Sequence, residues 1–153
     1  MSHNDGDEHW RKPMINSIKI NSDAAIFEDS KCYGRAYIIR DHEGQLIEAR
    51  SKYFQGRLHS DLAEVFGIKK ALSWIMMRGC KYVIVESDCL QMVQAIRSSI
   101  YGYSYLASVI EECCDMLANL RSKNILFRFV KRSANRVAHY LARHSFSHAD
   151  RTC

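Results

Sequence analysis

Apolar and polar residues alternate along the N-terminal third of the chain in the manner of β-strands. Residues 17–23, Ser-Ile-Lys-Ile-Asn-Ser-Asp, alternate with a period of two. Residues 33–40 are rich in aromatic and β-branched side chains, and the Asp-His-Glu-Gly sequence at 41–44 is typical of a turn. Residues 45–53 resume the strand pattern. Three successive strands joined by short turns predict an antiparallel meander.

The pattern then changes to helical spacing. Asp61 followed by Glu64 predicts a helix that starts with a capping box, and apolar residues recur at helical intervals up to Met77. Gly79 predicts the end of this helix. Residues 81–86 contain Tyr-Val-Ile-Val, a continuous apolar run that predicts a central strand buried on both faces.

The rest of the chain predicts three further helices and one further strand. The helices are expected at 88–98, at 106–120 and from Ser133 to about Phe146, and the strand at 125–130. We therefore predict an α/β domain with a mixed five-stranded sheet flanked by helices, in which a three-strand antiparallel meander precedes alternating helices and strands.

Composition supports one globular domain. The chain has 153 residues, of which 47% are apolar and 25% charged, and this excludes a disordered or membrane composition. We expect a flexible tail at 1–12, the domain at 13–147 and a C-terminal tail at 148–153. The formal charge of +5 is compatible with a polyanionic partner without requiring one.

Targeting signals and cysteine motifs are both missing from the sequence. Its polar start does not resemble a secretory signal, and no apolar run reaches the roughly 20 residues of a membrane helix. We expect an intracellular monomer, nuclear or cytoplasmic, without membrane contact. The six cysteines form no Cys-x-x-Cys pair and are expected to be reduced, small apolar residues.

Three acidic residues stand at the ends of predicted elements, and each has an ordinary structural explanation. Asp23, at the end of the first strand, suits a solvent-facing polar position. Glu64 suits a capping box, and Asp88 suits a helix N-cap completed by Gln91. These explanations stay open when each residue is considered alone.

The three carboxylates together suggest a metal site. They would converge at one end of the sheet if the first and fourth strands were neighbours and the first helix packed across them. Such crowding is unfavourable unless protons or cations neutralise it. Oxygen ligands favour Mg²⁺ or Mn²⁺, and two such ions about 4 Å apart can promote phosphodiester hydrolysis.

Five ordered pieces of the sequence resemble the ribonuclease H family, and in particular its plant-type, reverse-transcriptase-like branch, which also occurs in retroelement proteins. The resemblance covers about residues 10–145. Its pieces are Trp10-Arg-Lys-Pro13 with Lys19-Ile-Asn-Ser-Asp23, Tyr37-Ile-Ile-Arg-Asp41 with Gly44, Ala63-Glu64 with Ala71-Leu72, Val85-Glu-Ser-Asp88, and Val130-Lys-Arg132 with Asn135, Ala138-His139 and Leu141-Ala142.

The resemblance implies a two-metal endonuclease that cuts the RNA strand of RNA–DNA hybrids. Its four catalytic and metal-binding positions fall on Asp23, Glu64, Asp88 and His139. Mg²⁺ or Mn²⁺, two ions in all, is the implied cofactor. The implied nucleic-acid-binding residues are Asn21, Ala24, Lys131, Arg132 and Asn135, and Lys19 and Arg40 are further candidates for phosphate contacts.

Several positions depart from the family pattern. Ala24 replaces the usual glycine, and its methyl group could obstruct the approach of nucleic acid to the backbone. His139 replaces a fourth acidic ligand, although Ala-His is usual in the plant-type branch. Segment 130–135 has no loop histidine, and segment 100–105 is neutral where some relatives are basic. A weakly active or inactive nucleic-acid-binding module, or a protein-interaction domain, therefore remains an alternative.

Overall fold

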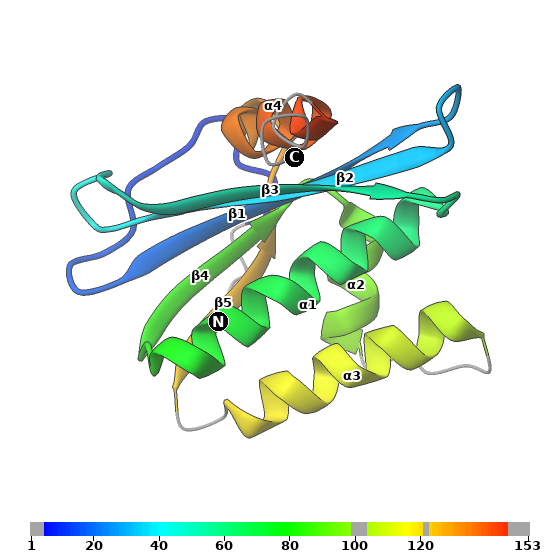
Figure 1. Cartoon of the computed structure of the whole chain (residues 1–153). Coiled ribbons are helices and arrows are strands. Elements are labelled where there is room, and N and C mark those ends of the chain that lie inside the picture. Colours follow the sequence, from blue (N-terminus) through cyan, green and yellow to red (C-terminus); the bar gives the residue numbers. More distant parts are fainter. Residues whose placement is uncertain (1–4, 99–103, 121–122, 147–153) are drawn as a thin grey trace.

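The computed structural model describes residues 5–98, 104–120 and 123–146, so most of the neutral segment at 100–105 and the expected C-terminal tail lie outside the described residues. The chain folds into one sheet with helices on both faces (Figure 1). The elements are β1 (Ile18–Phe27), β2 (Cys32–Arg40), β3 (Leu46–Gln55), α1 (Ser60–Arg78), β4 (Tyr82–Ser87), α2 (Leu90–Ser98), α3 (Tyr105–Asn119), β5 (Asn124–Phe129), the 3₁₀ turn η1 (Arg132–Ala134) and α4 (Arg136–Arg143).

The sheet confirms the predicted mixed topology. Its strand order is β3-β2-β1-β4-β5. β2 pairs antiparallel with both β1 and β3, as expected for a meander, whereas β4 pairs in parallel with β1 and β5. β1 and β4 are therefore neighbours that run in the same direction, which the predicted convergence of carboxylates required.

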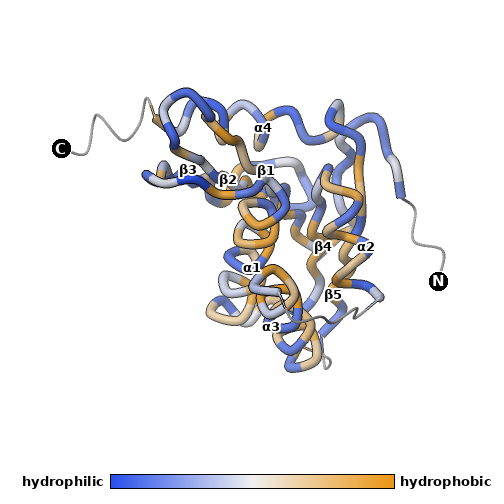
Figure 2. The backbone as a smooth tube through the Cα atoms, turned by 90° about the vertical axis from the view of Figure 1, so that its right-hand side faces the viewer, coloured by the Kyte–Doolittle hydropathy of each residue, from blue (hydrophilic) through white to orange (hydrophobic). Residues whose placement is uncertain are grey.

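The helices form two unequal layers around the sheet. α1 crosses one face obliquely, α2 and α3 pack beside it, and α4 alone lies on the opposite face (Figure 1). Apolar positions gather where α1, α2 and α3 meet the sheet (Figure 2), and this core includes Ile20, Val65, Ile68, Leu72, Val85 and Val93. No helix within the described ranges is both long and apolar enough to cross a membrane.

All four helices start one to three residues away from their predicted positions, and two of these differences have a clear structural reason. α1 begins one residue before Asp61, and His59 caps it by accepting a hydrogen bond from Asp61 N. The predicted capping box is wrong because the Glu64 carboxylate points away from the helix start, toward Ala24 N. The last helix starts at Arg136 rather than Ser133 because the backbone of Asn135, with φ −120° and ψ 24°, is not α-helical and separates η1 from α4.

Residues 5–12, expected to belong to a flexible tail, contact the domain: residues 5–7 lie beside the end of β5, and Trp10 and Arg11 contact β1. Asp7 forms a parallel β-bridge with Val130, and Gly6 N donates to Phe129 O at 2.9 Å. Acidic side chains of this segment pair with basic residues of the domain, and the Arg97–Asp5 ion pair is at 2.5 Å. The polar composition of the segment thus reflects charge pairing rather than disorder.

A buried polar network lies on the sheet face covered by this N-terminal segment. The Glu86 carboxylate accepts from Arg128 Nε at 2.7 Å and from Asn21 Nδ2 at 3.0 Å, and Lys19 Nζ lies 3.3 Å away. Asn21 also donates to Asn135 Oδ1 at 3.0 Å, and Asn135 Nδ2 donates to Ser22 O at 2.9 Å. The network fixes the start of α4 on β1, next to the strand ends.

Candidate metal and catalytic site

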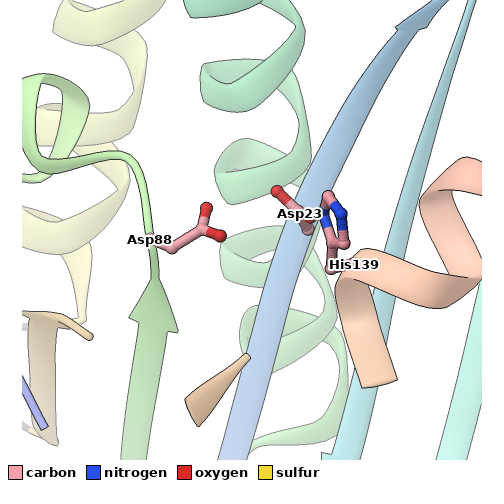
Figure 3. Close-up of side chains that lie close together, drawn as sticks. All are labelled: Asp23, Asp88 and His139. Atoms are coloured by element: carbon pink, nitrogen blue, oxygen red, sulfur yellow. Dashed lines mark hydrogen bonds and ion pairs between the residues drawn. The ribbon is translucent and has the colours of Figure 1, made fainter. Parts of the chain in front are cut away.

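The parallel pairing of β1 with β4 brings two aspartates together. Ser22 and Ser87 form the last pair of the β1–β4 ladder, and Asp23 and Asp88 are the next residues of their strands. β1 continues to Phe27, so Asp23 does not end its strand as predicted. It lies beside the point where β4 ends, and the parallel pairing places it level with Asp88. Ligand atoms of Asp23, Asp88 and His139 lie within 4.8 Å of one another (Figure 3).

His139 enters this group from α4, on the far side of β1. Its Nδ1 lies 2.7 Å from Asp23 Oδ2, so the imidazole and the carboxylate share a hydrogen bond. Asn135 stands one helical turn earlier, and its hydrogen bond to Ser22 O fixes α4 against β1. The position of His139 therefore depends on the buried asparagine contacts.

Glu64 reaches the same strand end from α1. β1 continues past the last β4 pair, and Ala24 N beyond this point donates to Glu64 Oε1 at 3.2 Å. The second carboxylate oxygen, Oε2, is buried and has no hydrogen-bond partner among the described residues. A buried carboxylate oxygen without a partner costs free energy, so this atom marks a place for a further ligand.

Burial, together with the nearby negative charge, raises the affinity of Asp88 and Glu64 for protons. Burial, reinforced by the charge of Asp23, raises the pKa of Asp88 to about 6, against an ordinary 3.8. Burial and the Asp23 charge also raise the pKa of Glu64 well above 4.5. Arg132 Nε donates to Asp88 Oδ2 at 3.2 Å and opposes the first of these shifts.

The donor set fits a divalent cation. Two aspartate carboxylates and one imidazole already converge, and the unpartnered Glu64 oxygen lies at the same strand end. Carboxylate oxygens suit Mg²⁺ and Mn²⁺, and a cation would relieve the repulsion that raises the pKa values. Asp23, Asp88 and His139, with Glu64 behind them, are thus the residues that would hold the metal.

The other predicted contact residues lie in two different environments. Lys131 and Arg132 are exposed, and Ala24 is half-buried beside Asp23. Asn21 and Asn135 are buried and engaged in hydrogen bonds, which leaves them a positioning role in this structure. The expected phosphate contact of Lys19 is wrong because its side chain is only 1% exposed and pairs with Glu86.

Sequence reasoning missed two groups of residues. Glu86 and Arg128 of the buried network looked like ordinary strand residues, and their isolation from water was not readable from the sequence. It also missed a set of basic residues between α1 and β3. The sequence pattern of these basic residues was visible: Arg50 and Lys52 stand two residues apart on β3, and Lys70 and Arg78 both lie on α1.

Solved structures support the fold. The N-terminal RNase H domain of a Mycobacterium tuberculosis protein, solved as a fusion with maltose-binding protein, superposes with a TM-score of 0.73 at 17% identity, over 89% of this chain and 97% of that one. An RNase H1 isolated from compost by a metagenomic approach gives a TM-score of 0.75 at 21% identity, over 88% and 99%. Its complex with an RNA/DNA hybrid gives 0.69 at 20% identity, over 86% and 98%.

The chain has the fold of these RNase H structures. The family model described as reverse transcriptase-like matches residues 21–145, so the chain belongs to that family. A search of curated proteins found no match.

Proposed function

We propose that this protein is a metal-dependent endonuclease that hydrolyses the RNA strand of RNA–DNA hybrids with two divalent ions. The observation that supports it best is the convergence of Asp23, Asp88 and His139 ligand atoms within 4.8 Å beside the end of β4. The hybrid-bound relative with the same fold supports the choice of substrate.

Each residue has a distinct part in this proposal. Asp23, Asp88 and His139 would hold the cations, and Glu64 Oε2 would be the buried acceptor beside them. Divalent cations bound there supply charge stabilisation and favour ionisation of the attacking water. His139 orients the Asp23 carboxylate through its hydrogen bond, and exposed Arg132 offers a cation to phosphate at the rim.

Cleavage of a labelled hybrid tests the proposal. The wild-type protein should cut the RNA strand with Mg²⁺ or Mn²⁺ and leave duplex DNA intact, whereas Asp88→Asn should lower the rate at least about 100-fold because it removes a charged ligand. Asp115→Asn, an exposed aspartate on α3, is the matched control and should keep full activity. Equal cleavage by wild type and Asp88→Asn would indicate a contaminating nuclease and reject the proposal.

One observation favours a second candidate, a nucleic-acid-binding module without catalysis. Asp23 and Asp88 already have nitrogen partners, His139 and Arg132. These partners partly neutralise the site without metal, and Ala24 adds a methyl group beside it. This candidate predicts salt-sensitive hybrid binding that is unchanged in Asp88→Asn, with no cleavage in either metal.

A further inference from the structure

A groove lined mainly by basic residues lies between α1 and the β2–β3 hairpin. Its cavity volume is about 380 Å³. Its charged lining residues are five cations and, among the described residues, one carboxylate: Arg35, Arg50, Lys52, Lys70, Arg78 and Glu48. We call these residues and the space between them the basic groove. The whole chain has a formal charge of only +5, so much of its excess positive charge gathers here.

Strand register explains how the groove forms. α1 packs on β1, β2 and β4, and the α1-facing side of β3 forms the opposite wall. Arg50 pairs with Tyr37 of β2, and Lys52 pairs with Arg35. Directly paired residues of neighbouring strands project from the same face, so cations of both β2 and β3 face α1.

The single carboxylate of the groove is already bound. Tyr37 Oη donates to Glu48 Oε2 at 2.8 Å, and Arg50 and Arg78 lie 3.7 Å and 3.6 Å from this carboxylate. The two arginines nevertheless remain 70% and 60% exposed, so their guanidinium groups still reach solvent. The groove therefore presents a surplus of positive charge to an anionic ligand.

One end of the groove approaches the edge of the sheet that carries the candidate metal site. Ala24 pairs with Arg35, and Arg35 pairs in turn with Lys52, so this row of side chains lies on the α1 face, whereas Asp23 projects from the other face toward His139. The nearest acidic residue on the α1 side is Glu64, three residues before Gly67, which lines the groove. Gly67 lies over Ser22, where an added Cβ would come within 2.9 Å of Ser22 Oγ. From Gly67 to Arg78 the groove follows α1 for about 16 Å.

We propose that the basic groove binds the phosphate backbone of a single-stranded nucleic-acid extension that continues from the candidate metal site. The cavity has the size of a small-molecule pocket, which suits one strand and not a duplex. Long, exposed basic side chains suit repeated phosphates, and the approach of one end of the groove to Glu64 favours nucleic acid over an acidic peptide. The inference rests on the proposed function.

Fluorescence anisotropy without metal tests this groove, since EDTA prevents cleavage. Three probes are compared: a blunt RNA–DNA hybrid, the same hybrid with a short single-stranded RNA extension at either end, and the extension alone. Wild type should bind the extended hybrid about tenfold more tightly than the blunt one, with a steeper salt dependence, because extra phosphates are neutralised.

Matched charge variants locate the effect. Arg50→Gln with Lys52→Gln and Lys70→Gln should abolish the advantage of the extension and reduce the salt slope by about 2–3. The control variant removes three exposed cations outside the groove, with Lys12→Gln, Lys81→Gln and Arg143→Gln, and should still bind the extended hybrid more tightly than the blunt one. Circular dichroism checks that both variants fold.

Three results would overturn the inference: no advantage of the extension in wild type, equal losses in both variants, or polyglutamate competing for the groove as well as single-stranded RNA. Failure of the proposed function has a different signature. In that case the protein neither binds nor cuts the blunt hybrid, while binding of the isolated extension still shows whether the groove holds a single strand.

Discussion

Two clusters of buried charge lie along β1 and β4, and they differ in how the charge is balanced. In the network around Glu86, both carboxylate oxygens have partners, and Lys19 and Arg128 supply positive charge. In the cluster around Asp23, three carboxylates share one arginine and one histidine, and Glu64 Oε2 has no partner within the described part of the chain.

The difference distinguishes a structural cluster from a functional one. A buried carboxylate surrounded by its own cations and hydrogen bonds needs nothing further from outside. In the second cluster, burial and the charge of Asp23 raise the pKa values of Glu64 and Asp88. A bound cation can offset the repulsion among these carboxylates. From this charge balance we infer a structural role for the first cluster and propose ligand binding for the second.

The largest effect is expected from breaking the balanced cluster. Glu86→Ala leaves Lys19 and Arg128 buried without their partner and should lower the free energy of unfolding by about 3–5 kcal/mol. Urea denaturation measures this loss. Glu112→Ala, which breaks the exposed pair with Lys69, is the control and should cost less than about 1 kcal/mol. Similar small losses in both variants would remove the structural role of the network.

The next effect is expected from adding the proposed divalent cation. Mn²⁺ or Mg²⁺ at 100 times its dissociation constant should stabilise wild type by about 2.7 kcal/mol, because the ion binds the folded cluster alone. EDTA should reverse the gain, and Asp23→Asn should abolish it. A gain that persists in Asp23→Asn would place the ion elsewhere and contradict the assignment of the acidic cluster.

The sequence predicted most of this architecture because period-two alternation and helical spacing are local signals. β2, β3, α1 and β4 fall within two residues of where those patterns placed them, whereas β1 continues four residues beyond its predicted end. The adjacency of β1 and β4 was a condition of the predicted convergence, and the sheet meets it. Asp23 became a candidate as the expected last residue of the first strand, and Asp88 as the residue that follows the fourth. The pattern identified the end of β4, but Asp23 lies inside β1.

Features that depend on long-range pairing were not predictable in the same way. Trp10, in the expected tail, donates to Asn21, and Lys19 lies inside the protein with Glu86. Glu64 was expected both as a capping residue and as a member of the acidic cluster, and its contact with Ala24 N, 40 residues away in sequence, was not predictable. Partner choice among polar groups is set by packing in three dimensions, which composition and periodicity do not encode.

Neutralising Asp88 should have a smaller effect than losing Glu86, and it should raise rather than lower the free energy of unfolding. Because the pKa of Asp88 is about 6 in the folded protein against an ordinary 3.8, the folded state holds more protons between these values and stability falls as pH rises through them. Asp88→Asn removes this fall and should raise the free energy of unfolding in EDTA above pH 6 by about 1 kcal/mol. Urea titrations from pH 4 to pH 8 measure it. Destabilisation by Asp88→Asn across this range would show that the cluster is balanced without metal.

The smallest effect should come from replacing Arg132, the arginine that donates to Asp88. Arg132→Gln removes the cation that lowers the pKa of Asp88, so that pKa should rise above about 6 and the fall in stability should extend to higher pH. The side chain is 69% exposed, so the change in free energy should stay below about 1 kcal/mol. The acidic limb of the cleavage profile should move in the same direction, since a protonated Asp88 cannot bind metal. Arg136→Gln, an exposed change at the start of α4, is the control. An identical pH profile for Arg132→Gln and wild type would mean that solvent, and not this arginine, sets the charge state of Asp88.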